Sequence, residues 1–142
     1  MTPARTQDLL LWATLAFAAS CGGSSSTEST GNNNPPPTAQ PNDVQIVVGA
    51  STKGSGAFNP DNKTISLAGA ATATVRWVNI DMSSDGYSTV GVTHHIVSND
   101  GTSFDTGNIA ANEVMSKTLS AGTYPYHCIL HPSMTGTVVV TP

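Results

Sequence analysis

The sequence predicts an all-β domain, an antiparallel β-sandwich, over residues 42–142, and three observations support this fold class. Seven short runs of β-forming residues follow one another in this region, at 44–48, 64–67, 73–79, 94–98, 114–120, 123–128 and 136–141. Turn-forming stretches such as NPDN, NDG and TGN lie between the runs. No window of the region has the period of an amphipathic helix. About 100 residues are enough for one hydrophobic core, so we expect a single domain.

The first four runs are justified by composition and alternation. VQIVV and TISL are rich in the β-branched residues that fit a pleated sheet. In ATVRWVN, Arg76 must face solvent, so Val75 and Trp77 point towards the core. HHIVS ends at an Asn-Asp-Gly turn.

The last three runs, VMSKTLS, TYPYHC and GTVVVT, complete the sandwich. In TYPYHC, Tyr124, Tyr126 and Cys128 share one parity, so the thiol lies on the same face as two tyrosine rings. We expect both rings in the core. Pro125 removes one donor from the strand ladder, which favours an edge position or a strand end.

The residues before this domain begin with an export signal. Residues 9–19 form an apolar run of signal-peptide length, too short for the roughly 20 apolar residues of a membrane-spanning helix. Small residues lead from this run into Cys21, and this pattern resembles a bacterial lipoprotein signal. The resemblance implies that residues 1–20 are removed and that lipid on Cys21 anchors the protein to a membrane, facing the periplasm or the cell exterior. The alternative is an ordinary secretory signal in which Cys21 is incidental.

Residues 21–41 are predicted to be a flexible tether. After Cys21 the sequence GGSSSTESTGNNNPPPTAQP contains no large apolar residue, so it cannot bury enough surface to offset the entropy of ordering. A flexible coil of this length has an end-to-end distance of about 25 Å. The tether would hold the domain close to the membrane while leaving it free to turn.

The charge of residues 42–142 argues against one class of partner. The region has four basic and seven acidic side chains, a net charge of −3, and no cluster of basic residues. Nucleic-acid-binding domains present a basic patch, so we expect no nucleic-acid partner.

The stretch TYPYHCILHPSMTG concentrates unusual side chains. It holds one of the chain's two cysteines and two of its four histidines. Cys128, His131 and Met134 form the pattern Cys-x2-His-x2-Met on a loop between two strands. A thiolate, an imidazole and a thioether are a soft, mixed donor set suited to copper, whereas zinc seldom recruits methionine and calcium needs oxygen donors. If Cys21 carries lipid, Cys128 is a lone thiol in an oxidising compartment, and a metal bond would protect it.

A copper site made of two histidines, one cysteine and a weak axial methionine needs one more histidine. His127 is a poor ligand because, on an extended strand, it points to the face opposite its neighbouring cysteine. His94 and His95 remain. Periodicity cannot choose between them, because the two residues that follow are both apolar.

Three segments resemble the small blue copper proteins, the cupredoxins. YHCILHPSMTGTVVV is similar to their C-terminal signature, most of all to that of amicyanin and plastocyanin relatives, and the two-residue gap before Met134 is amicyanin-like. THHIVSNDGTSFDTG resembles the strand of the first histidine ligand, and WVNID resembles the strand before it. The resemblance covers about residues 44–142 and implies a cupredoxin-like Greek-key β-sandwich that binds one copper ion.

The resemblance also implies a ligand set and a function. The ligands would be His94, Cys128, His131 and Met134, and the protein would be a monomeric one-electron carrier. His131 would lie near the surface, in an apolar patch where redox proteins dock transiently. Four protein ligands leave no open metal position, so we expect no enzymatic turnover.

Two features depart from the family's pattern, and other interpretations stay open. His95 stands where the family often has Asn or Thr tying the ligand loops together, so that tie differs here or His95 competes as the ligand. Residues 82–93 are longer than the usual connection and predict an extra loop near the copper end. The alternatives are a copper protein for delivery or sequestration, a structural zinc site of His94, Cys128 and His131, and a metal-free sandwich.

Overall fold

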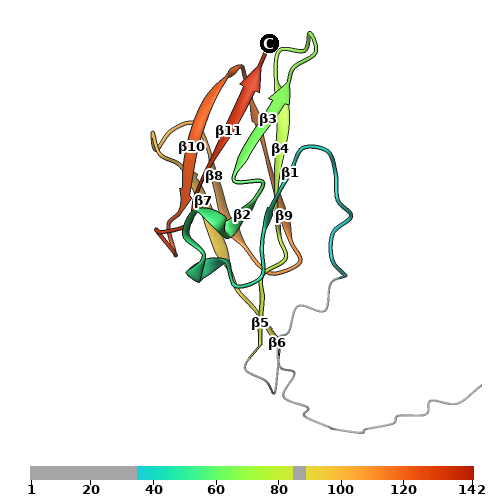
Figure 1. Cartoon of the computed structure of the whole chain (residues 1–142). Coiled ribbons are helices and arrows are strands. Elements are labelled where there is room, and N and C mark those ends of the chain that lie inside the picture. Colours follow the sequence, from blue (N-terminus) through green and yellow to red (C-terminus); the bar gives the residue numbers. More distant parts are fainter. Residues whose placement is uncertain (1–34, 85–88) are drawn as a thin grey trace, which may run out of the picture.

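Two β-sheets pack against each other in the computed structural model, which describes residues 35–84 and 89–142 (Figure 1). One sheet has the strand order β2-β1-β4-β9, and the other has the order β3-β11-β10-β7-β8. The predicted all-β sandwich is confirmed. The predicted signal segment, Cys21 and the tether as far as residue 34 lie outside the described residues. Within the described residues, no helix is both long enough and apolar enough to cross a bilayer.

The predicted strands are all present. Each of the seven runs overlaps a strand, and four further strands, β2, β5, β6 and β8, join them. Two short 3-10 helices, η1 (Ala50–Thr52) and η2 (Gly54–Ala57), connect β1 to β2. The strands are β1 (Asp43–Ile46), β2 (Phe58–Asn59), β3 (Asn62–Ser66), β4 (Ala73–Asn79), β5 (Met82–Ser84), β6 (Thr89–Gly91), β7 (His94–Ser98), β8 (Asp105–Ile109), β9 (Val114–Leu119), β10 (Gly122–Cys128) and β11 (Thr135–Thr141).

The sandwich is not wholly antiparallel. β1 runs parallel to β4, and β3 runs parallel to β11, while the other neighbouring strands of the two sheets are antiparallel. Residue alternation is the same in parallel and antiparallel strands, so the sequence pattern could not reveal these two pairs.

The TGN stretch, expected as a turn, lies inside β8. Gly107 has a φ of 68°, and the register between β7 and β8 shifts between His95 and Val97. A glycine in the left-handed region can accommodate a bulge, so the strand continues past it.

Pro125 is not on an edge strand, because β10 lies between β11 and β7. The pairing of β10 with β7 begins one residue later, at Tyr126 opposite Ser98. The Pro125 carbonyl accepts a hydrogen bond from the Asn99 N–H at 2.9 Å, just past the end of β7. The proline therefore stands at the end of the β7 ladder, within an interior strand.

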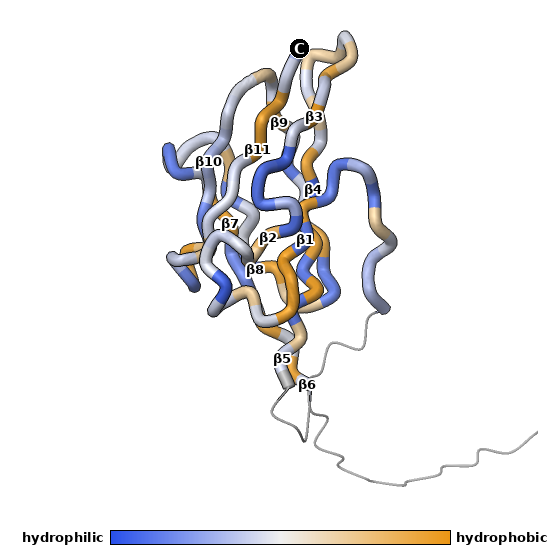
Figure 2. The backbone as a smooth tube through the Cα atoms, in the orientation of Figure 1, coloured by the Kyte–Doolittle hydropathy of each residue, from blue (hydrophilic) through white to orange (hydrophobic). Residues whose placement is uncertain are grey.

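An aromatic cluster fills the space between the sheets. Trp77 of β4 contacts Tyr126 of β10 edge-on, with ring centroids 5.7 Å apart. Phe104 packs against both rings, and Phe58 packs against Tyr126. Such ring pairs contribute about 0.5–1.5 kcal/mol each beyond their buried area. β1, β4 and β11 contain hydrophobic stretches (Figure 2). This core fixes the inner face of β10, which ends at Cys128.

The end of β10 and the start of β7 lie at one end of the sandwich, away from the C-terminus (Figure 1). β5 and β6, an antiparallel pair within the longer connection at 82–93, project from the same end.

Candidate metal centre

Two adjacent strands and one loop supply the predicted ligands. β10 and β7 are antiparallel neighbours, with Cys128 opposite Ile96. His94 precedes Ile96 by two residues, so its side chain lies on the same inner face. His131 and Met134 belong to the loop that joins β10 to β11.

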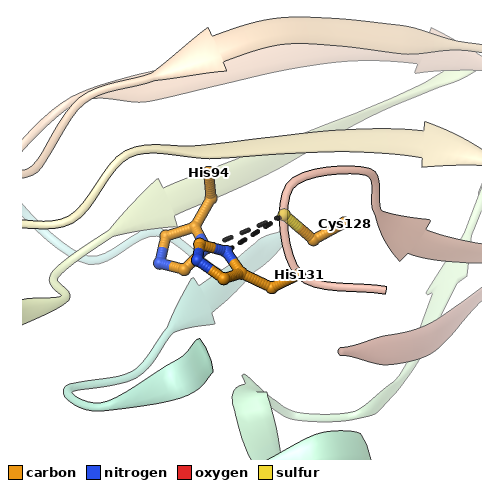
Figure 3. A group of neighbouring side chains, drawn as sticks. All are labelled: His94, Cys128 and His131. Atoms are coloured by element: carbon orange, nitrogen blue, oxygen red, sulfur yellow. Dashed lines mark hydrogen bonds between the residues drawn. The ribbon is translucent and has the colours of Figure 1, made fainter. Parts of the chain in front are cut away.

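Three of the predicted residues form a compact group, the thiol–imidazole cluster of His94, Cys128 and His131. The Cys128 Sγ lies 3.8 Å from the His94 Nδ1 and 3.7 Å from the His131 Nδ1. The three ligand atoms lie within 4.8 Å of one another. Figure 3 shows both rings on the same side of the sulfur, each with a nitrogen turned towards it. His94 and Cys128 are fully buried, while His131 is half-buried.

Met134 is held in the same loop by two backbone hydrogen bonds. Its N–H donates to the His131 carbonyl at 2.9 Å, and its carbonyl accepts from the Cys128 N–H at 3.1 Å. The loop is thus closed on itself, and the Met134 side chain is fully buried.

His95 lies on the other face of β7. Its Nε2 is 2.5 Å from the Asp105 Oδ1, away from the thiol. The His95 backbone nevertheless reaches the site, because its N–H donates to the Cys128 Sγ at 3.4 Å and its carbonyl accepts from the Ile129 N–H at 2.9 Å. We expected the connection between β7 and the ligand loop to differ at this position. It includes two hydrogen bonds made by the main chain of His95. Of the two histidines that the sequence left open, His94 is the one beside Cys128.

His127 also points away from the thiol, as expected. Its Nδ1 lies 2.7 Å from the Asn99 Oδ1, and its ring is half-buried. The chain's four histidines therefore divide into two beside the thiol and two on the outer face of the same strand pair.

A buried carboxylate that the sequence reasoning did not single out lies behind His94. The Asp81 Oδ2 is 2.9 Å from the His94 Nε2, and neither side chain is exposed. The Asp81 carboxylate also accepts hydrogen bonds from the N–H groups of Gly49, at 2.6 Å, and Ala50, at 3.1 Å. In the sequence, Asp81 continues the parity of Val75 and Trp77 but lies past the end of β4 at Asn79, so the strand pattern gave no sign of this contact.

Burial sets the protonation state of His94. Desolvation lowers the pKa of its ring below the ordinary value, and the nearby His131 lowers it further, while the hydrogen bond and the charge of Asp81 act in the opposite direction. A lowered pKa keeps the ring neutral at neutral pH. A neutral imidazole is the form that binds a metal ion.

The donor set fits a copper ion. One buried thiol and two imidazole Nδ1 atoms converge, and a buried methionine closes the same loop. Thiolate, imidazole and thioether together suit copper, and no carboxylate of the described residues joins the three-residue group. These residues are consistent with one bound copper ion.

Solved structures share this fold. No family model and no curated protein matches the chain. A purple cupredoxin from Nitrosopumilus maritimus is 25% identical over 70% of this chain and 98% of its own, with a TM-score of 0.55. A copper-containing nitrite reductase from Thermus scotoductus SA-01 is 28% identical over 74% of this chain, with a TM-score of 0.52, but the match spans only 23% of that enzyme's chain. A mutant amicyanin in its Cu(I) state is 21% identical over 69% of this chain and 79% of its own, with a TM-score of 0.48.

The fold is therefore cupredoxin-like, on the strength of the match to the purple cupredoxin. At the end of its sandwich the chain carries a His-Cys-His cluster that resembles a copper site.

Proposed function

We propose that this protein is a type 1 copper protein that carries single electrons between redox partners. The observation that carries the proposal is the convergence of the Cys128 Sγ and the Nδ1 atoms of His94 and His131 within 4.8 Å. Met134, buried in the same loop, would supply a fourth and weaker donor through its thioether. When bound, the copper ion supplies reversible one-electron exchange between Cu(I) and Cu(II).

The contribution of the chain is a fixed set of donors. Cu(I) and Cu(II) prefer different coordination, so donors that hold one arrangement reduce the rearrangement needed at each exchange. His94 and Cys128 belong to paired strands over an aromatic core, and backbone hydrogen bonds close the loop that carries His131. The His95 N–H donates to the Cys128 sulfur and so ties it to β7.

His131 is proposed as the route by which electrons enter and leave. It is the half-buried member of the cluster, whereas the other two are fully buried. Beside it in the loop, Ile129 and Leu130 are 45% and 49% exposed. An exposed apolar rim suits a small interface that forms and separates quickly, so we propose transient docking of redox proteins here.

We also propose that the carrier is exported and tethered. Lipid on Cys21 would hold it at a bacterial membrane, facing the periplasm or the exterior, and would raise its effective concentration near membrane-bound partners. The purple cupredoxin and the nitrite reductase are copper proteins by their names. The match covers only 23% of the nitrite reductase chain, so the reaction of that enzyme is not carried over to this protein. We propose an electron carrier that has no enzymatic activity of its own.

Metal analysis with an optical spectrum of the purified protein tests the proposal. We expect one copper per chain and an intense visible band that a reductant bleaches and an oxidant restores. Stoichiometric copper without colour would contradict electron transfer and favour delivery or sequestration. Stoichiometric zinc would indicate a structural site, and a metal-free protein would indicate a sandwich without a metal role.

A further inference from the structure

We infer that Asp81 is the positioning residue of the metal centre: it fixes the tautomer and the orientation of His94, so that the Nδ1 lone pair faces Cys128. The His94 ring lies between the two groups, with its Nε2 2.9 Å from the Asp81 Oδ2 and its Nδ1 3.8 Å from the Cys128 Sγ. The identity of the metal in this inference rests on the proposed function.

The tautomer follows from the chemistry of the two partners. A neutral imidazole has one N–H donor and one lone pair. Two backbone N–H groups, those of Gly49 and Ala50, already donate to the Asp81 carboxylate, so its oxygens act as acceptors. An acceptor 2.9 Å from the His94 Nε2 requires the proton on that nitrogen, which leaves the lone pair on Nδ1. Neither side chain is exposed, so an acceptor facing a bare nitrogen would leave that nitrogen unpaired and place two lone pairs against each other.

The carboxylate cannot turn to follow another arrangement of the ring. The backbone N–H of Asp81 donates to the Asn79 Oδ1 at 2.9 Å. The Asn79 side-chain amide in turn donates to the carbonyls of Val92, at 2.7 Å, and Ile109, at 2.9 Å. The Gly49 N–H that holds the Asp81 Oδ1 comes from a residue with a φ of 71°, a conformation that favours glycine. Two backbone N–H groups therefore hold the carboxylate itself, and Asn79 holds the main chain of Asp81.

The chain contains a matched control for this pair. His95, the next residue, also presents its Nε2 to a carboxylate, that of Asp105. That pair is on the outer face, where the side chains of His95 and Asp105 are 18% and 65% exposed. It has the same chemistry as the buried pair but makes no contact with the thiol–imidazole cluster through a side chain.

The inference predicts what Asp81→Asn changes. The amide keeps the shape of the carboxylate but puts an N–H₂ group where one oxygen stood, so it faces a backbone donor or the His94 Nε2. Losing such a partner of a metal-binding histidine typically weakens metal binding by about 10- to 100-fold. A carboxylate hydrogen-bonded to the ring increases the basicity of the nitrogen that binds the metal, and this favours the more highly charged Cu(II) over Cu(I). Removing it should raise the reduction potential, and a tenfold larger loss for Cu(II) than for Cu(I) corresponds to about 59 mV.

The first test uses the metal-free full-length protein and heteronuclear NMR of the ring nitrogens. We expect the His94 ring to carry its proton on Nε2 in the native protein and in Asp105→Asn. In Asp81→Asn we expect the Nδ1–H form to appear. A native His94 protonated on Nδ1 would overturn the inference without any variant. An unchanged tautomer in Asp81→Asn together with an unchanged affinity for Zn²⁺ would do the same, because a carboxylate that merely caps η1 would alter stability and leave both as they were.

The second test measures affinity for Zn²⁺, a redox-silent probe, by competition with a chelator. We expect Asp81→Asn to bind about 10- to 100-fold more weakly than the native protein. Asp105→Asn should match the native protein, and Asp81→Glu should recover part of the loss. Equal affinity of Asp81→Asn and the native protein would overturn the inference. If Asp81→Asn does not fold, the native tautomer and Asp81→Glu still decide the question.

The two proposals can fail separately. A native protein without copper colour but with the expected tautomer and Zn²⁺ loss would overturn the electron carrier and support Asp81. The opposite result is a native protein with the copper colour and an Asp81→Asn variant with unchanged reduction potential, tautomer and Zn²⁺ affinity. This result would support the electron carrier and overturn the inference about Asp81.

Discussion

The two faces of the β7–β10 strand pair carry similar side chains in different surroundings. On the inner face, His94 lies between Asp81 and Cys128 without exposure to solvent. On the outer face, His95 bonds to Asp105, and His127 on the neighbouring strand bonds to Asn99. Each of these three histidines has a side-chain acceptor beside one ring nitrogen.

The two faces differ in whether water can replace a lost hydrogen-bond partner. On the outer face, water can take the place of a lost partner, so each pair contributes little. On the inner face, a lost partner leaves a buried donor or acceptor unpaired, which costs about 1–3 kcal/mol. Parity alone separates the two faces, since one step along a strand moves a side chain from one to the other. The predictions below test this difference, beginning with the largest effect.

Cys128→Ser should remove the thiolate from the inner face and abolish the copper-dependent visible band. A serine hydroxyl keeps the size of the side chain but does not provide the sulfur donor on which that band depends. The absorption spectrum of the copper-loaded variant is the measurement. His127→Ala, one residue earlier on the outer face, should keep the colour. A band that survives in Cys128→Ser would show that the cysteine assignment is wrong.

His94→Ala and His95→Ala compare adjacent residues on opposite faces. His94→Ala should lose the colour and should also lower the unfolding free energy of the metal-free protein by about 1–3 kcal/mol, because it takes a donor from the buried Asp81. His95→Ala should stay coloured and change that free energy by no more than about 0.5 kcal/mol. Urea unfolding and the optical spectrum measure both effects. The reverse result would transfer the ligand role to His95.

Gly136→Ala tests the packing under the inner face. A Cβ at this position would stand 2.4 Å from the Tyr126 hydroxyl oxygen, so the ring that supports β10 must shift. Overpacking of this kind costs about 1–3 kcal/mol. Urea unfolding of the metal-free protein measures it, with the exposed neighbour Thr135→Ala as the control at about 0.5 kcal/mol or less. Equal stability of the two variants would mean that Tyr126 has room to move.

Asp105→Asn should have the smallest effect, and the effect should depend on pH. The Gly107 N–H, followed by His95, holds the pKa of the Asp105 carboxyl below its ordinary value of 3.8. A lowered folded-state pKa contributes stability that is present above the ordinary value and lost as the pH falls through the folded-state value. The variant should therefore lose about 0.2–1 kcal/mol at neutral pH, a range set by solvent screening, and little in acid. Unfolding curves at several pH values measure the difference; a loss that grows in acid would contradict it.

Most of the fold was predictable because alternation and turns are local properties. Each of the seven predicted runs overlaps a strand, and Val75 and Trp77 are buried as their parity required. The sequence could not predict which neighbouring strands run parallel, because strand direction depends on how the chain crosses between the two sheets. The TGN stretch misled for a related reason: Gly107 has the conformation of a turn residue but serves a bulge within β8.

The candidate site was predictable in the loop and less so beyond it. Cys128, His131 and Met134 lie close together in the sequence, so their spacing was visible. His94 and His95 could be told apart by resemblance but not by parity, because each is followed two residues later by an apolar side chain. Asp81 could not be found, because its role depends on a contact with His94 across the fold.

The two main-chain bonds of His95 have a practical consequence for engineering. An amide and a carbonyl persist whatever side chain the residue bears, proline excepted. The side chain at position 95 is therefore open to replacement, for instance to attach a dye one residue from His94, while both main-chain bonds to the ligand loop are kept.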